Sequence, residues 1–303
     1  DKDTLQGWNN DANNLKELLN AEQEEPQDAE PQIDRAAELQ EKWQTASGQL
    51  WQLGKHRLLI GDCTVRENVE RLMGGERAKL FVTDPPYGVD YSSLRTSQAE
   101  VRRTTVEYDD IEADKLNGDD LQKFLESVFS NCKDFLDKKA AWYIWHAQMT
   151  QGFFAAAAAA ADILIHRQII WVKPSFIFGR GDYHWKHELC FYGWVKGFRP
   201  PFYGERNQDT VWMLGGGGSS GGTHKDHPTQ KPLEIYDIPI KNHTQNEEAI
   251  LDPFAGSGTC IISAHNLSRR CYAMEISEKY GAVILERFAT AFPAEEIKLV
   301  SNG

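Results

Sequence analysis

From residue 50 onward, short apolar runs alternate with segments whose apolar residues recur every three or four positions, and this pattern constrains the fold most strongly. Residues 56–62 and 79–83 are expected to form strands. Arg66–Met73 lies between them and is expected to form a helix that stops at Gly74 and Gly75. Strands that alternate with helices predict an α/β fold with a doubly wound, mostly parallel sheet and helices on both faces.

The other expected elements follow the same two patterns. Residues 121–136 repeat apolar side chains at helical spacing, and the alanine-rich segment 155–161 is a strong helix former. Further strands are expected at 140–146, 163–172, 189–195, 249–251 and 270–276, and further helices at 33–43, 259–267 and 278–292.

Composition narrows the class of protein. With 41% hydrophobic and 26% charged residues, the chain can bury a sizeable core. No run approaches the roughly 20 apolar residues that a membrane span needs, and no leader peptide is visible, so we expect no membrane partner. The five cysteines are an odd number and include no CxxC pair, which argues against a disulfide framework and a structural zinc site and for the reducing environment of a cytoplasmic protein.

Charge is distributed unevenly along the chain. Residues 1–48 hold −8 of the net charge of −12, and we interpret them as an acidic linker or tail that contains one short helix. Residues 49–303 are expected to form the main domain, in which 92–118 is predicted to be a mobile loop. The stretch 173–231 carries a net charge of +3, so the acidic total does not exclude a nucleic-acid partner.

The first chemical motif is Asp84-Pro85-Pro86-Tyr87, directly after the expected strand 79–83. Ligands bind at the carboxyl ends of strands in open α/β sheets. The prolines stiffen the turn and remove two N–H donors. A carboxylate, a fixed carbonyl and an aromatic ring can together accept the hydrogens of an exocyclic amino group and stack on its ring. A proline-rich turn with a helix-capping aspartate is the alternative.

The second motif is the segment 251–259, LDPFAGSGT, where a strand, a turn with Gly256 and Gly258, and a helix follow one another. The glycines allow a ligand to approach the backbone closely. Glu275 ends the next expected strand, where an acid can bind ribose hydroxyls. The turn lacks the dinucleotide fingerprint and the lysine of a phosphate-binding loop, so a nucleoside without phosphates fits better.

On these motifs the chain resembles the amino-group DNA methyltransferases, which methylate adenine N6 or cytosine N4 with S-adenosylmethionine. The DPPY tetrad lies 168 residues before Asp252, an order similar to the circularly permuted β group. The segments GDC at 61–63, HPTQKP at 227–232 and YAME at 272–275 match the family in order. The stretch from residue 51 and the segment 179–188 are similar to methylases with an N-terminal ParB-like domain.

The resemblance implies a Rossmann-like class I methyltransferase fold, circularly permuted, with one antiparallel strand near a sheet edge. It implies N6-adenine methylation of a base flipped out of the duplex, with Asp84, Pro85, Pro86 and Tyr87 as the catalytic residues. It also implies S-adenosylmethionine as cofactor, DNA as substrate, no metal, and possible homodimerisation.

Cofactor-binding residues carried over by this resemblance come from five segments. They are Asp62, Cys63, Asp84, Lys231, Asp252, Phe254, Gly256, Gly258, Thr259 and Glu275. A structural role is the alternative for three of them: Thr259 as a helix-start residue, Lys231 as a solvated lysine and Cys63 as a small buried side chain.

Target recognition is expected within residues 175–226, and the loop 92–118 is expected to face DNA. The candidates for phosphate or base contacts are Arg95, Arg102, Arg103, Arg180, His184, Lys186, His187, Arg199 and Arg206. A solvated surface is the alternative for each of these residues.

Three other functions compete with adenine methylation. N4-cytosine methylation shares the pocket chemistry, although an aspartate at position 84 favours adenine. Glutamine methylation of a protein fits less well, because that family places Asn at this position and its cofactor loop first. A catalytically inactive DNA-binding module is opposed by the intact tetrad.

Overall fold

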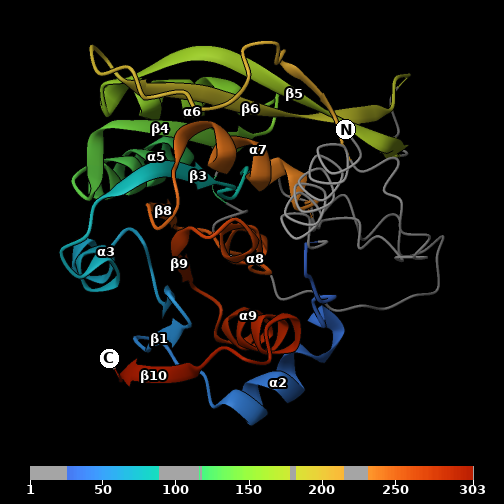
Figure 1. Cartoon of the computed structure of the whole chain (residues 1–303). Helices are drawn as coiled ribbons and strands as arrows, with labels where there is room; N and C mark the ends of the chain where they lie inside the picture. Colours follow the sequence, from blue (N-terminus) through green and yellow to red (C-terminus); the bar gives the residue numbers. More distant parts are fainter. Residues whose placement is uncertain (1–25, 89–115, 117, 178–181, 215–230, 303) are drawn as a thin grey trace, which may run out of the picture.

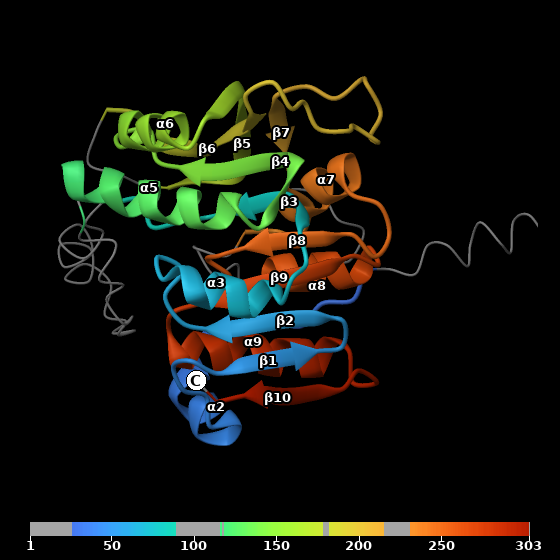
Figure 2. The same cartoon turned by 90° about the vertical axis from the view of Figure 1, so that its left-hand side faces the viewer.

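One ten-stranded sheet organises the part of the chain that the computed structural model describes, residues 26–88, 116, 118–177, 182–214 and 231–302 (Figures 1 and 2). Its spatial order is β10-β1-β2-β9-β8-β3-β4-β6-β5-β7. The strands are β1 Leu50–Leu53, β2 His56–Ile60, β3 Ala78–Thr83, β4 Leu136–His146, β5 Ile163–Ile177, β6 Trp185–Val195, β7 Val211–Met213, β8 Ala249–Asp252, β9 Arg270–Glu275 and β10 Ile297–Ser301.

Five neighbouring strands, β2, β9, β8, β3 and β4, run parallel in the centre of the sheet. β6 runs against β4 and β5, and β1 runs against β2 and β10. The mostly parallel α/β sheet is therefore confirmed, with two opposing strands where the resemblance implied one. Parallel central strands place the ends of β3, β8, β9 and β2 at one edge, which we call the carboxyl edge.

Helices cover both faces, as expected for a doubly wound sheet (Figure 2). On one face α3, α5 and α6 pack with Phe81 and Leu251, and on the other α7, α8 and α9 pack with Leu80 and Ile250. This division follows from strand geometry, because successive side chains point to opposite faces. The helical elements are η1 Ile33–Arg35, α2 Ala36–Trp43, α3 Arg66–Met73, α5 Gly118–Lys133, α6 Gln151–Ala160, α7 Glu234–His243, α8 Thr259–Asn266 and α9 Glu278–Ala291.

Most expected elements are present, within a few residues of their predicted ends. The sequence patterns missed β1, β7, β10 and α7. The first three are strands of three to five residues, and α7 contains Pro239, which normally argues against a helix. Residues 92–115 and 117 of the predicted loop 92–118 lie outside the described residues, as do residues 215–226 of the predicted target-recognition region, and Gly118 begins α5.

The predicted helix at 33–43 forms as η1 and α2, and it packs against α9 instead of standing apart from the domain. Leu39 is buried with Ala282 and Val283, and Trp43 Nε1 donates a hydrogen bond to Glu286 Oε2 at 2.8 Å. Residues 26–48 are thus attached to the sheet domain through the apolar face of α2.

No helix among the described residues is both long and apolar enough to span a bilayer.

Candidate functional site

The two chemical motifs lie side by side, although they are far apart in the sequence. β3 and β8 pair in parallel, with Leu80 opposite Ile250 and Phe81 opposite Leu251. At their ends, Thr83 Oγ1 donates a hydrogen bond to Asp252 Oδ1 at 3.1 Å. The DPPY turn and the glycine turn therefore leave the sheet together at its carboxyl edge.

Asp84 has both carboxylate oxygens engaged. Tyr87 donates its hydroxyl hydrogen to Asp84 Oδ1 at 2.6 Å, and the Lys231 ammonium donates to Asp84 Oδ2. Lys231 Nζ also lies 3.3 Å from the Tyr87 hydroxyl. The structure thus brings together the catalytic and HPTQKP segments of the sequence analysis, and Lys231 is a buried lysine paired with a carboxylate, not a solvated one.

Glu188 and Lys173, which the sequence analysis did not assign, extend this ionic group. Glu188 Oε1 lies 2.5 Å from Lys173 Nζ, and Glu188 Oε2 lies 3.2 Å from Lys231 Nζ. Glu188 comes from β6 and Lys173 from β5, where the two strands pair near the carboxyl edge. The sequence held one signal for this site, an acid that directly precedes the apolar run 189–195 of a buried strand.

Electrostatics keeps Lys231 and Glu188 ionised. Burial acts to lower the pKa of Lys231, but the carboxylates of Asp84 and Glu188 outweigh it and raise that pKa above its usual value. Burial likewise opposes ionisation of Glu188, yet Lys231 and Lys173 hold its pKa below the usual range.

Aromatic side chains surround the ionic group. The Tyr87 ring lies 6.4 Å from Phe154, and Lys231 Nζ lies 5.4 Å from the centroid of the Trp145 ring. His146 ends β4 beside Phe154, and burial lowers its pKa to about 4, so it is neutral at pH 7. Its Nε2 is buried and has no hydrogen-bond partner among the described residues.

The glycine turn borders open space at Gly256. Gly256 has a φ of +55°, and a Cβ placed there would meet no atom within 4 Å. Its N–H donates to Glu275 Oε2 at 2.9 Å, and Ser277 N–H donates to Glu275 Oε1 at 2.9 Å. Gly258 also has a positive φ, but a Cβ there would press on Ile284 at 3.1 Å. Gly256 thus borders open space, and Gly258 permits close packing of the turn.

Two carboxyl groups beside the glycine turn, those of Asp252 and Glu275, have raised pKa values. Burial raises the pKa of Asp252 to about 7 and the pKa of Glu275 to about 7. Asp252 is fully buried, and its Oδ1 accepts hydrogen bonds from Thr83 and from the Phe254 N–H, while Oδ2 has no partner among the described residues. Asp252 thus connects the end of β3, which precedes the DPPY turn, with the glycine turn through buried hydrogen bonds.

Asp62 and Cys63 reach the same edge from β2. Ile60 is in register with Glu275, and Gly61 N–H donates to Glu275 O at 2.9 Å. Cys63 is buried, and burial raises its thiol pKa well above the usual value. These contacts bring the GDC segment next to the acid expected to bind ribose.

Thr259 begins α8 and contacts a residue that the sequence analysis did not single out. Arg287 Nη1 donates to Thr259 Oγ1 at 3.0 Å and to Ser257 O at 3.0 Å. The same buried guanidinium binds Asp28 with contacts of 3.0 and 2.9 Å. Arg287 therefore joins the N-terminal arm, residues 26–32, to the glycine turn.

The candidate DNA contacts separate into two groups. His184, Lys186 and His187 lie at the start of β6, at the carboxyl edge, and His184 stacks on Phe176 with ring centroids 5.1 Å apart. Arg199 and Arg206 are exposed in the segment between β6 and β7, which begins at the opposite edge, so the structure does not bring them to the DPPY turn. The remaining candidates, Arg95, Arg102, Arg103 and Arg180, lie outside the described residues.

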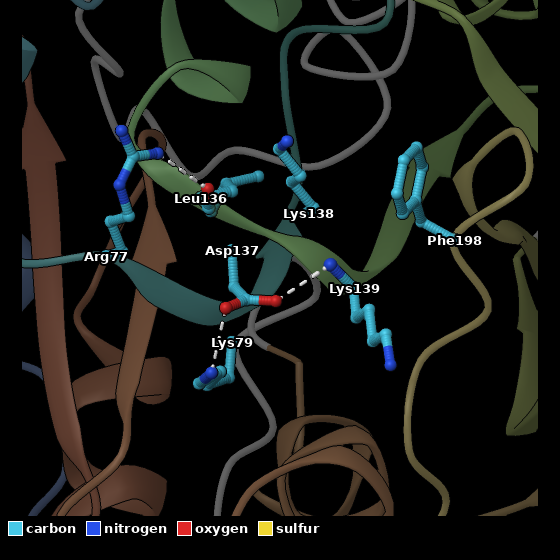
Figure 3. Close-up of a pocket in the computed structure, with 7 residues that line it drawn as sticks. All are labelled: Arg77, Lys79, Leu136, Asp137, Lys138, Lys139 and Phe198. Atoms are coloured by element: carbon cyan, nitrogen blue, oxygen red, sulfur yellow. Dashed lines mark hydrogen bonds and ion pairs between the residues drawn. The ribbon is translucent and has the colours of Figure 1, made fainter.

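A cavity of about 610 Å³ also lies at that opposite edge, where β3 and β4 begin (Figure 3). One ion pair lies within it, in which Lys79 Nζ is 2.9 Å from Asp137 Oδ2. It is separate from the candidate site and is lined by Arg77, Lys79, Leu136, Asp137, Lys138, Lys139 and Phe198.

Comparison with solved structures supports the fold assignment. The complex of M1.HpyAVI with SAM aligns with 76% of this chain and 97% of its own, with a TM-score of 0.54 and 18% identity. The PvuII cytosine-N4-specific DNA methyltransferase aligns with 76% of this chain and 85% of its own, with a TM-score of 0.55 and 14% identity. At these sequence identities, the two similarities show that the fold is shared.

Sequence comparison identifies the family. The type II methyltransferase M.HinfI of Haemophilus influenzae is 26% identical over 275 residues, which cover 80% of this chain and 71% of the relative. The family model for N6/N4 DNA methylases matches residues 78–286, a span that includes both motifs and Lys231. The chain therefore belongs to the N6/N4 DNA methylase family.

Proposed function

We propose that this DNA methyltransferase transfers a methyl group from S-adenosylmethionine to N6 of adenine. The observation that carries the proposal is the position of Asp84, at the end of β3 and next to the glycine turn that follows β8. We expect a target amino group at Asp84 and a donor in the open space at Gly256 to meet at this edge of the sheet. When bound, S-adenosylmethionine supplies a methyl group already activated by its sulfonium centre.

The proposed cofactor site consists of Gly256, Glu275 and the segment 62–63. Glu275 is held by the N–H groups of Gly256 and Ser277, which orient its carboxylate for ribose hydroxyls. The open space over Gly256 suits close approach of a nucleoside to the backbone. We assign Asp252 and Thr259 supporting roles, because their side chains bind other parts of the protein.

In the proposed reaction Asp84 and the Pro85 carbonyl accept hydrogen bonds from the two N–H groups of the target amino group. The nitrogen lone pair is otherwise delocalised into the base, and these hydrogen bonds would direct it towards the methyl carbon. The bond from sulfur to methyl would break as the N–C bond forms, the demethylated thioether would leave, and the nitrogen would release one proton to solvent. Tyr87 is half-buried against Phe154 and would stack on the base. Because a duplex hides this amino group, the base must leave the stack to reach Asp84.

The order of the motifs supports the β-group assignment within the family, since Asp84 precedes the glycine turn by 168 residues. Aspartate at position 84 supports adenine over cytosine as the target. N4-cytosine methylation is the second candidate, because the PvuII cytosine-N4 enzyme shares the fold over 76% of this chain.

The test is to incubate the protein with labelled S-adenosylmethionine and duplex DNA and to identify the methylated nucleoside by mass after digestion. We expect N6-methyladenosine in its deoxy form. N4-methyldeoxycytidine would overturn the choice of adenine, and unmodified DNA would overturn the activity itself.

The matched variants for this assay are Asp84→Asn and Asp137→Asn. Both aspartates pair with a lysine and both are about one-third exposed or less, but Asp137 lies at the opposite edge of the sheet. Asp84→Asn should lower kcat by about 100-fold or more, because the amide oxygen is an uncharged and weaker acceptor than a carboxylate oxygen. Asp137→Asn should retain the wild-type rate.

A further inference from the structure

Two lysines and two carboxylates form a continuous row beside the DPPY turn. Lys173 contacts Glu188, Glu188 contacts Lys231, and Lys231 contacts Asp84. Their side chains are between 8% and 28% exposed, and their formal charges cancel. Since an unpaired charge is costly in such an environment, the four groups behave as one balanced unit.

Lys231 contacts the carboxylates of Asp84 and Glu188 in two different ways. Its ammonium donates a hydrogen bond to Asp84 Oδ2, whereas the 3.2 Å contact with Glu188 Oε2 is an ion pair without hydrogen-bond geometry. Glu188 Oε2 is buried and has no hydrogen-bond partner among the described residues. This oxygen therefore retains acceptor capacity, and the Lys231 ammonium lies 3.2 Å from it.

Asp84 must change its hydrogen bonds when a target amino group arrives. In the structure Tyr87 occupies Oδ1 and Lys231 occupies Oδ2. A lysine with a single counter-ion would remain on Asp84 and compete with the amino group. A lysine with a second carboxylate at 3.2 Å can shift towards it without leaving its charge unpaired.

We infer that Glu188 is a positioning residue for methyl transfer, which takes over the Lys231 ammonium when Asp84 accepts the target amino group. Lys173 holds the other oxygen of Glu188 and fixes the carboxylate in place. This inference rests on the proposed role of Asp84. It assigns no contact between Glu188 and the substrate or the cofactor.

A double-mutant cycle tests whether Glu188 acts through Lys231. The variants are Glu188→Gln, Lys231→Met and the combination of the two, and the measurements are kcat and KM with DNA and labelled S-adenosylmethionine. Glu188→Gln should lower kcat by on the order of 10-fold. It should change the calorimetric Kd of the cofactor by less than about twofold, because Glu188 lies outside the glycine turn.

The combined variant decides the inference. If Glu188 acts through Lys231, the combination should be no slower than Lys231→Met alone. If the kcat losses of Glu188→Gln and Lys231→Met multiply in the combined variant, the inference is overturned and the proposed function stays intact. A wild-type protein that methylates no DNA would overturn both.

Asp137→Asn combined with Lys231→Met is the matched control for the cycle, because it removes a carboxylate paired with Lys79 at the opposite edge (Figure 3). It should leave kcat at the value of Lys231→Met. Thermal unfolding checks that each variant is folded.

A second comparison does not depend on Lys231→Met being folded. Glu188→Asp keeps the charge but shortens the side chain, whereas Glu188→Gln keeps the length and removes the charge. The inference requires a higher kcat for Glu188→Asp than for Glu188→Gln. The opposite order would indicate that side-chain shape matters instead, and would overturn it.

Discussion

Thr83 Oγ1 donates a hydrogen bond to the buried Asp252 Oδ1 at 3.1 Å, and this bond joins two strand ends whose residues are 169 positions apart in the chain. The bond lies between paired strands, β3 and β8, at the point where both turns begin. The relative position of the two turns therefore depends on a buried polar contact as well as on the sheet.

Thr83→Val should destabilise the protein without a change of side-chain shape. The variant removes one of the two donors to Asp252 Oδ1 and leaves only the Phe254 N–H. We expect the free energy of unfolding to fall by about 1 kcal/mol, the usual net contribution of one hydrogen bond, because Oδ1 keeps the Phe254 N–H as a donor. Denaturant unfolding measures it.

Thr290→Val is the control for this prediction, since Thr290 is exposed on α9 and its hydroxyl donates to Glu286 O. It should change the free energy of unfolding by less than about 0.5 kcal/mol. Equal losses of unfolding free energy in Thr83→Val and Thr290→Val would show that the buried hydrogen bond to Asp252 stabilises the protein no more than an exposed one.

Asp252→Asn should become more stable relative to the wild type as the pH rises from about 4 to about 7. Burial raises the pKa of Asp252 from 3.8 in the unfolded chain to about 7 in the folded protein. Across that window the folded state retains a proton that the unfolded state has lost, so the wild-type stability from this group falls with pH. The asparagine does not titrate.

The comparison with wild type is essential, because buried histidines act in the opposite direction. Burial lowers the pKa of His56 to about 3 and those of His146 and His243 to about 4, so their contribution to stability rises with pH. Denaturant unfolding of both proteins at pH 5 and pH 8 isolates the Asp252 effect. A difference in unfolding free energy between Asp252→Asn and wild type that is the same at both pH values would contradict the prediction.

Sequence patterns predicted that each motif follows a strand, and the parallel pairing of β3 with β8 brings the two strand ends to a common edge. They did not predict which side chains pair. Lys231 was assigned to the cofactor, and the structure pairs it with Asp84 and Glu188. Such pairings depend on the order of strands in space, which places β6 next to β4 and is not encoded in any local pattern.

Local rules also failed where one residue contradicted its neighbours. Pro239 lies inside α7, where its neighbours Ile235 and Ile240 are buried against the sheet. Burial of this face outweighs the lost backbone hydrogen bond, and no helix was expected there. The arm at 26–32 was assigned to a linker on composition, although one buried arginine, Arg287, fixes it.

Asp28→Asn should weaken both the fold and cofactor binding. It removes the carboxylate that pairs with the buried Arg287, whose other contacts support Ser257 and Thr259 at the glycine turn. Because Asp28 is itself 32% exposed, we expect a loss of about 1–2 kcal/mol in the free energy of unfolding. Calorimetry should give a severalfold weaker Kd for S-adenosylmethionine.

Asp34→Asn is the matched control for the arm, since Asp34 is an exposed acid on η1. It should leave both measurements at their wild-type values. Cofactor affinity that is unchanged in Asp28→Asn would show that the arm stabilises α9 without influencing the glycine turn.

Lys186→Ala should weaken DNA binding, and Arg199→Ala should not. Lys186 is exposed at the start of β6, on the same edge as Asp84, whereas Arg199 is exposed beyond the other end of that strand. A duplex that presents a base to Asp84 must lie along the carboxyl edge, where a phosphate can reach Lys186. Loss of one phosphate contact lowers the slope of log K against log salt by about 1. Fluorescence anisotropy at several salt concentrations measures this slope. A larger loss in Arg199→Ala than in Lys186→Ala would place the DNA on the opposite edge and contradict the proposed orientation.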